Sequence, residues 1–344
     1  MKKLLFIAVM ALFASCNSSS EEPAATEPQV VNIYSHRHYD IDQTLFDKFK
    51  TETGITVNVV KANADELLVR LEQEGDKSPA DLLVTSDAGR LARAAEGGFL
   101  QPLGSAVVNE LVPSYLRDAN DLWTGLTMRA RVIVCSKERV PQGTVQNYAD
   151  LAKPEMKGKV LCRSSDNLYN QSLMAGMIAH MGDSAAAEWA KSVRGNMARE
   201  PKGNDRDQVM AIAAGEGDVS IVNTYYLGLL STSENPDEVL AAQNVYVVFP
   251  DQNGNGTHVN VSGAGLLKHA PNKANAVKLI EFLLSEESQR AYADANFEYP
   301  VRNGVAASDL LISWGDFKRD ELNLSVLGSN NPNAVEAFRK AGWE

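Results

Sequence analysis

The adjacent pair Tyr225-Tyr226 is the feature of the sequence whose residue types and spacing point most directly to chemistry. It follows a short β-branched run at residues 219–222 and the polar residues Asn223 and Thr224. Neighbouring side chains on a strand point to opposite faces, whereas at a turn or a helix start both phenols can converge on one point. The alternative is structural: one ring packs in a core and the other covers it.

A third tyrosine, Tyr169, occupies a second position of this kind. A strand predicted to run to Cys162 is followed by residues 164–167, whose side chains are good helix N-caps, so Tyr169 should lie in the first turn of a helix. The positive end of a helix favours negative charge, so a phenol there offers a donor oxygen and its ionised form is favoured. His38 and Tyr39 follow another predicted strand, at residues 30–34.

Predicted strands alternate with predicted helices along the chain. Strands at residues 55–60 and 81–84 flank a helix that Asp65 is expected to cap and that buries Leu67, Leu68 and Leu71. The second half repeats this style, with a further helix at residues 185–193. The pattern predicts an α/β fold with a largely parallel sheet, whose ligands lie beyond the carboxyl ends of the strands.

Length and charge narrow the class of protein. With 344 residues the chain can form two domains or lobes, and 44% hydrophobic with 22% charged residues is ordinary for a globular protein. The formal net charge of −11 argues against nucleic acid and anionic membrane surfaces as partners.

The first residues have the pattern of an export signal. Residues 1–15 combine a lysine start with an apolar stretch too short to span a bilayer, which predicts a signal peptide. Small residues directly before Cys16 resemble the lipobox of bacterial lipoproteins, so Cys16 is expected to carry a lipid anchor. Residues 16–29 are then a flexible tether. The mature protein is expected in the periplasm or on the outer face of a bacterial cytoplasmic membrane.

Several segments together resemble one family, the ferric-iron-binding solute-binding proteins of ABC importers, also called bacterial transferrins. The matching segments occur in the family order and cover nearly everything after residue 30. They are residues 34–39, 78–85, 125–132, 147–158, 169–172, 223–226 and 299–301.

The resemblance implies a type II periplasmic-binding-protein fold, in which two α/β lobes are joined by crossover strands around a ligand cleft. Residues 30–126 and 250–300 would form lobe 1, and residues 127–249 and 301–344 would form lobe 2. The implied role is to bind ferric iron and deliver it to an ABC permease, as a monomer and not as an enzyme. The implied iron ligands are His38, Tyr39, Tyr169, Tyr225 and Tyr226. Arg129 or Arg131 could hold a synergistic anion such as carbonate.

The chemistry of the ligand set agrees with that role. Fe³⁺ is a hard ion that prefers oxygen donors, and the metal must displace the phenol protons because a free phenol ionises near pH 10. Two other functions stay open: the same fold binding an anion, a polyamine or a thiamine-like cation, and a lipid-anchored metal-dependent hydrolase using His36, His38 and Asp40. Cys135 and Cys162 are expected to be free, buried thiols rather than a disulfide.

Overall fold

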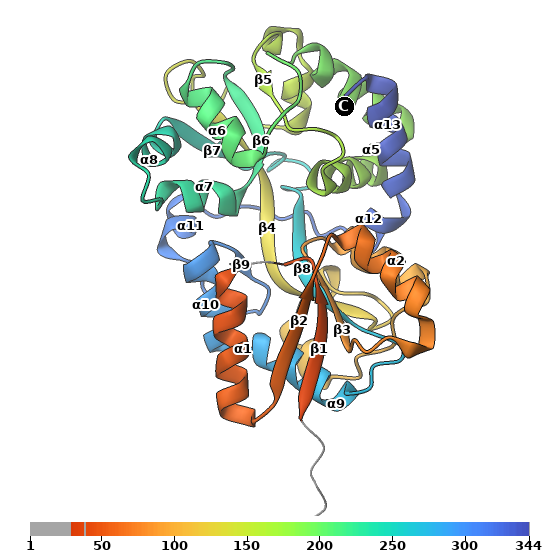
Figure 1. Cartoon of the computed structure of the whole chain (residues 1–344). Coiled ribbons are helices and arrows are strands. Elements are labelled where there is room, and N and C mark those ends of the chain that lie inside the picture. The colour runs from red at the N-terminus through yellow and green to blue at the C-terminus, as the bar shows by residue number, and fades with distance from the viewer. Residues whose placement is uncertain (1–28, 38, 344) are drawn as a thin grey trace, which may run out of the picture.

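The computed structural model describes residues 29–37 and 39–343, which fold into two halves stacked one above the other (Figure 1). The strands are β1 (Val30–Ser35), β2 (Thr56–Lys61), β3 (Leu82–Thr85), β4 (Trp123–Ser136), β5 (Val160–Leu161), β6 (Val219–Asn223), β7 (Val245–Val248), β8 (Val259–Leu266) and β9 (Tyr299–Pro300). The α-helices are α1 (Asp40–Thr53), α2 (Ala64–Glu74), α3 (Ala88–Glu96), α4 (Ala106–Leu111), α5 (Leu168–Gly195), α6 (Asp205–Ala213), α7 (Thr224–Ser231), α8 (Pro236–Gln243), α9 (Lys273–Leu283), α10 (Glu286–Asn296), α11 (Asp309–Ser313), α12 (Val326–Ser329) and α13 (Asn331–Ala341). Short 3₁₀ helices are η1 (Gly75–Lys77), η2 (Ser114–Leu116), η3 (Tyr148–Ala152) and η4 (Pro154–Met156).

The strands form one mixed sheet that passes through both halves, in the order β2-β1-β3-β8-β4-β6-β5, with β7 and β9 also paired to β4. In the lower half β1 is parallel to β2 and to β3, and in the upper half β5 is parallel to β6. The remaining pairs are antiparallel. The expected α/β fold is confirmed, and its sheet is mixed rather than largely parallel.

Strand β4 connects the two halves. All of its residues are buried, and it pairs with β8 from Trp123 to Ala130 and then with β6 from Arg131 to Cys135. Figure 1 shows β4 and β8 running side by side between the halves. Residues at the middle of β4 therefore lie close to both halves at once.

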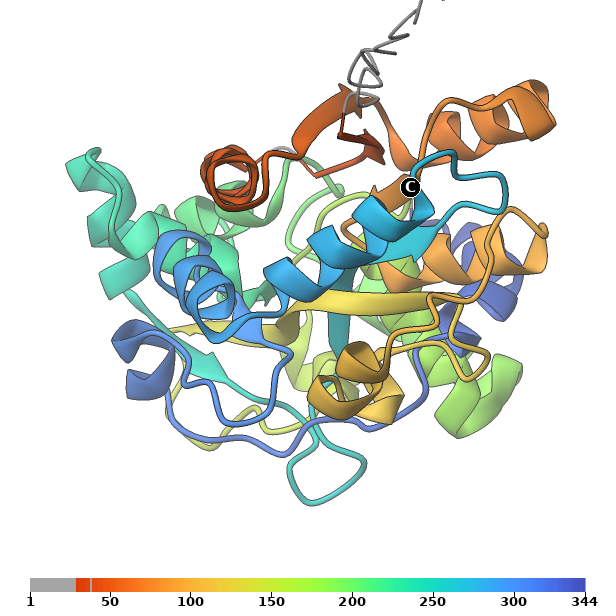
Figure 2. The same ribbon diagram turned by 90° about the horizontal axis from the view of Figure 1, so that it is seen from below.

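In the lower half, helices α1, α2 and α9 pack against the part of the sheet that contains β1 and β2. Helix α1 buries Leu45 and Phe49 and ends at Gly54, whose φ of 75° is a left-handed conformation that glycine adopts without a steric penalty. The view from below shows α9 crossing the sheet beside α1 (Figure 2). Helix α2 buries the expected leucines, but its N-cap is Asn63 and not Asp65. Asn63 and Glu66 form a reciprocal capping box, which satisfies two backbone donors and so fixes the start two residues earlier.

The upper half contains one element that differs from the prediction. The helix expected at residues 185–193 belongs to the second of two helical segments in α5, and a break at Gly182, where φ is 80° and ψ is 164°, separates the two segments. Cys135 and Cys162 are both buried and free, as expected. Over the residues that the structure describes, no helix is long and apolar enough to cross a membrane.

Candidate metal site

The corner between β6 and α7 positions Tyr225 and Tyr226. Strand β6 is buried between β4 and β5, and α7 begins directly after it, so both tyrosines lie in the first turn of the helix. Their ring centroids are 4.3 Å apart at an interplanar angle of 35°. Tyr225 is 2% exposed, whereas Tyr226 is half-buried. Convergence at a helix start, one of the two interpretations of the sequence, is the observed geometry.

Tyr169 meets this pair from the start of α5. Asn167 is the N-cap, and its side chain accepts a hydrogen bond from the Tyr169 backbone N–H at 3.0 Å, so the predicted first-turn position is confirmed. The Tyr225 hydroxyl donates to the Tyr169 hydroxyl oxygen at 3.0 Å. Two phenol oxygens that are far apart in sequence are thus in direct contact.

Tyr39 reaches the same place from the lower half. It is the N-cap residue of α1, it is half-buried, and its ring packs edge-on against Tyr225 with centroids 6.2 Å apart. The structure therefore brings the four predicted tyrosines together. His38 lies outside the described residues. His36 is half-buried, and its Nδ1 pairs with the Ser86 hydroxyl at 2.8 Å.

Arg37 fixes the backbone that leads into Tyr39. Its buried guanidinium group forms ion pairs with Asp42 and Glu298, each at 3.1 Å, and also lies 4.8 Å from the centre of the Tyr39 ring. Burial raises the pKa of Glu298, but the Arg37 charge and hydrogen bonds from Arg37, Thr127 and other side chains outweigh it and lower that pKa. The pair is therefore charged at neutral pH and ties the start of α1 to the segment before β9.

Burial also controls the protonation of the phenols. It raises the pKa of Tyr39, Tyr225 and Tyr226, to about 12 for Tyr226, and the negative charge of an ionised Tyr169 raises each of them further. Without a cation these phenols are neutral at physiological pH. A cation that binds them must displace protons, and a highly charged ion does so most effectively.

Three guanidinium groups surround Tyr169. The Cζ atoms of Arg129, Arg131 and Arg163 lie 5.3, 5.9 and 5.8 Å from the centre of its ring. Several of their buried N–H groups, Nη1 of Arg129 and Nε of Arg131 and of Arg163, have no hydrogen-bond partner among the described residues. The charge of Arg129 acts to lower the pKa of Tyr225 and that of Arg163 to lower the pKa of Tyr226, against the larger effect of burial.

Asp205 holds two of these arginines in place. Its carboxylate is 0% exposed and accepts from Arg131, from Arg163 at 3.1 Å and from the backbone N–H of Asn223 at 2.7 Å. Arg131 also donates to Asn170, beside Tyr169, at 2.7 Å. Sequence reasoning missed Asp205, because the only local signal at this position is an ordinary helix start after Asn204.

The donors at this junction are of one chemical type. Phenol oxygens gather there, and within residues 29–37 and 39–343 no group of three or more His, Cys, Asp or Glu side chains could hold a metal ion. Phenolate oxygens suit hard, highly charged cations rather than zinc or copper. The fold and the site together define a two-lobed α/β binding protein in which phenols from both halves converge.

Comparisons with known proteins place the chain in a family. Residues 77–317 match the family described as bacterial extracellular solute-binding protein, and this chain belongs to that family. Iron uptake protein A1 of Synechocystis sp. is 47% identical over 336 residues, covering 97% of this chain and 93% of that protein. The structure described as Trichodesmium (IdiA) (FutA) in complex with iron and citrate ligands is 46% identical with a TM-score of 0.88, covering 92% of this chain and all of that one. Apo FutA2 from Synechocystis is 43% identical, with a TM-score of 0.87 and 92% of this chain covered.

Proposed function

We propose that this protein binds ferric iron between its two halves and delivers it to an ABC permease for uptake. The single observation that carries the proposal is the convergence of four phenols from both halves on one place. The similarity to proteins named for iron uptake, and to one structure described with iron and citrate, supports the same ligand.

The proposed ligands are Tyr39 from the lower half and Tyr169, Tyr225 and Tyr226 from the upper half, with His38 as a fifth. Each phenol would lose its proton to bind, which gives a set of anionic oxygens matched to a small trivalent cation. Because the ligands come from both halves, bound iron would hold the halves together, and iron-free protein would open more readily.

A synergistic anion such as carbonate could complete the coordination of the iron. Arg129 suits this role better than Arg131. Arg131 donates from both terminal nitrogens, to Asp205 and to Asn170, and only its Nε lacks a partner among the described residues. Arg129 donates to the Ser86 carbonyl from Nη2, but its terminal Nη1 is buried without a partner in the described part of the chain. The set of anionic phenolates also reduces the need for an anion.

A transport role makes this chain a carrier rather than an enzyme. The hydrolase alternative relied on His36, His38 and Asp40, and it loses support because the family is one of solute-binding proteins. A polyamine or a thiamine-like cation would need carboxylates or stacking aromatic surfaces rather than a cluster of hydroxyl groups that contact one another.

Titration of the purified protein with ferric citrate tests the proposal, because ferric phenolate complexes absorb visible light. Wild-type protein should develop a red or orange band that saturates, and Tyr226→Phe should weaken or abolish it while leaving the melting temperature of the iron-free protein nearly unchanged. Tyr115→Phe, a half-buried tyrosine elsewhere in the lower half, is the matched control. A wild-type band that Tyr226→Phe leaves intact would mean that the iron ligands lie elsewhere.

We also propose the location and the division of the chain. Residues 1–15 would be a signal peptide, Cys16 the lipid-anchored residue and residues 16–29 a tether; of these, only residue 29 lies within the described residues. Residues 30–126 with 250–300 and residues 127–249 with 301–344 would be the two lobes of a periplasmic or membrane-anchored monomer. Cys16→Ser should move the protein from the membrane fraction to the soluble fraction, and identical fractionation would contradict the anchor.

A further inference from the structure

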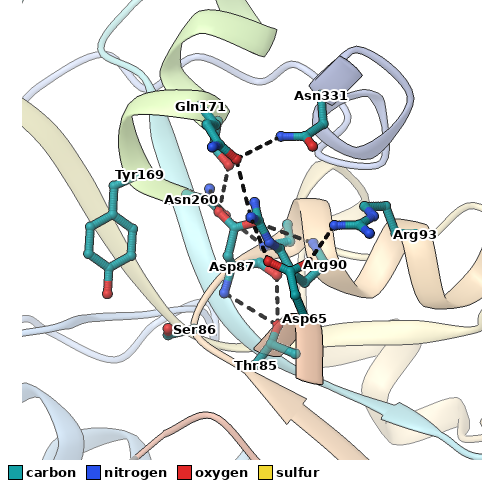
Figure 3. A network of polar contacts seen from close by, with 12 residues as sticks. Asp65, Thr85, Ser86, Asp87, Arg90, Arg93, Tyr169, Gln171, Asn260 and Asn331 are labelled. Atoms are coloured by element: carbon teal, nitrogen blue, oxygen red, sulfur yellow. Dashed lines mark hydrogen bonds and ion pairs between the residues drawn. The ribbon is translucent and has the colours of Figure 1, made fainter. Parts of the chain in front are cut away.

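The loop between β3 and α3 lies where the two halves meet (Figure 3). Its shape is fixed internally, because the Thr85 hydroxyl donates to the Asp87 carbonyl at 2.7 Å and accepts from the Asp87 N–H at 3.3 Å. Asp87 is 0% exposed and caps α3 by accepting from the Arg90 N–H at 3.2 Å. This buried carboxylate belongs to the lower half.

The second oxygen of Asp87 reaches the upper half. It accepts from the Ser172 hydroxyl at 2.6 Å and from the Asn260 amide at 2.8 Å. Ser172 is buried in α5, three residues after Tyr169, so it lies in the same part of the helix. Asn260 lies on β8, and its amide oxygen accepts from the Ala88 N–H at 3.0 Å, which fixes the amide as a donor toward Asp87. Asp87 thus connects α3, the crossover strand β8 and the start of α5.

The neighbouring Ser86 connects the same loop to the surroundings of Tyr169 and of Tyr39. Its carbonyl oxygen accepts from Arg129, whose guanidinium group lies over the Tyr169 ring. Its hydroxyl pairs with His36, in the segment that leads to Tyr39. The loop at residues 85–87 therefore contacts the surroundings of the lower-half ligand and of one upper-half ligand.

A second layer of contacts, next to Asp87, also joins the two halves. The Gln171 side-chain oxygen accepts from Arg90 of α3 at 3.2 Å and from Asn331 at the start of α13 at 3.1 Å. Asp65 of α2 in turn pairs with Arg90 at 3.2 Å. Figure 3 shows these side chains pointing toward one another beside Asp87. This layer is more exposed, so it contributes less than the buried contact between Asp87 and Ser172.

We propose that Asp87 is a positioning residue for iron: through Ser172 it fixes the start of α5, and so the Tyr169 oxygen, relative to the half that carries Tyr39. The inference rests on the proposed function. Ligands must be held within a fraction of an ångström of their productive geometry, and a hydrogen bond to a buried charge is strong enough to do so. The contact exists in the arrangement that brings the phenols together, so it stabilises that arrangement over an open one and slows iron release.

Ser172→Ala tests the positioning role of Asp87 with little disturbance of the loop, because Asp87 keeps its hydrogen bonds from Asn260 and Arg90. Ser220→Ala is the matched control: Ser220 is a fully buried serine of β6 whose hydroxyl has no partner among the described residues. Ferric-loaded proteins are mixed with excess EDTA, and the decay of the visible band gives the release rate. Ser172→Ala should release iron about ten times faster, the effect of losing one hydrogen bond to a buried charge, and Ser220→Ala should match the wild type.

A double-mutant cycle with Asp87→Asn separates positioning from general destabilisation. If Ser172 acts through Asp87, then Ser172→Ala should change the release rate much less in the Asp87→Asn background. Equal release by the wild type, Ser172→Ala and Ser220→Ala would overturn the inference, and so would a lower melting temperature of Ser172→Ala with an unchanged release rate. No visible band in the wild type would contradict the proposed function itself, and the inference with it.

Discussion

Asp205→Asn should weaken ferric binding and destabilise the fold together, because one buried carboxylate supports three parts of the candidate site. Asp205 accepts from Arg131 on β4, from Arg163 after β5 and from the Asn223 N–H directly before α7. Asparagine keeps the size of the side chain and removes its negative charge. The two guanidinium groups would then lose their common counter-charge in a buried place.

The expected loss of stability follows from the burial of the ion pair between Arg131 and Asp205. The Arg131 and Asp205 side chains are 2% and 0% exposed, and removing one partner of such a buried pair lowers the free energy of unfolding by about 3–5 kcal/mol. The amide oxygen of asparagine still accepts one hydrogen bond, so we expect a loss near the lower end of that range. Domains are stable by about 5–15 kcal/mol, so the iron-free variant should remain folded.

Urea denaturation of the iron-free protein measures the loss, and ferric titration measures the effect on binding. Asp218→Asn is the control, because Asp218 pairs with the more exposed Arg139 at 2.7 Å, and such a surface pair contributes less than about 1 kcal/mol. Asp205→Asn should also lower ferric affinity at least tenfold, since the corner that carries Tyr225 loses its anchor. If its stability loss equals that of Asp218→Asn and its titration equals that of the wild type, the reasoning about Asp205 is wrong.

Three further results are expected. Burial, and then the charges of Arg129 and Arg131, lower the pKa of His258 to about 3. Below pH 6.5 His258 binds a proton in the unfolded chain but not in the folded protein, so the free energy of unfolding should fall with decreasing pH by up to about 1.4 kcal/mol per pH unit. His258→Gln should flatten this slope in urea denaturation, and equal slopes for the variant and the wild type would contradict the assignment. Ferric affinity should fall as the pH drops, because the pKa values of the buried phenols are raised and each phenol must release a proton to bind iron. An affinity that is unchanged between pH 8 and about pH 6 would exclude phenolate ligands. Thiol titration of the unfolded, unreduced protein should detect both Cys135 and Cys162, and finding neither would indicate a disulfide.

The elements that carry the site were predictable because their signals are local. The β-branched run before Asn223 predicts β6, and a turn or a helix start after it is one of two interpretations of Tyr225-Tyr226, of which the helix start is observed. The N-cap at Asn167 likewise follows from the residue types next to its helix. Local rules failed where two of them competed, as at α2, where the capping box of Asn63 prevailed over Asp65.

The supporting contacts were not predictable, since they join residues that are distant in sequence. Asp205 is 74 residues from Arg131, and Asp87 is 85 residues from Ser172. Nothing in the neighbourhood of an aspartate shows which arginine or serine will reach it after folding. The resemblance to iron-binding proteins identified the tyrosines, but only the fold identifies the side chains that hold them in place.

A crystal structure of the ferric-loaded protein, with diffraction data collected at the iron absorption edge, tests the central claim most directly. We predict one strong anomalous peak bonded to the phenol oxygens of Tyr39, Tyr169, Tyr225 and Tyr226, with the hydrogen bond between Tyr225 and Tyr169 replaced by bonds to iron. An anomalous peak bonded to other side chains, or one that touches fewer than two of these oxygens, would contradict it.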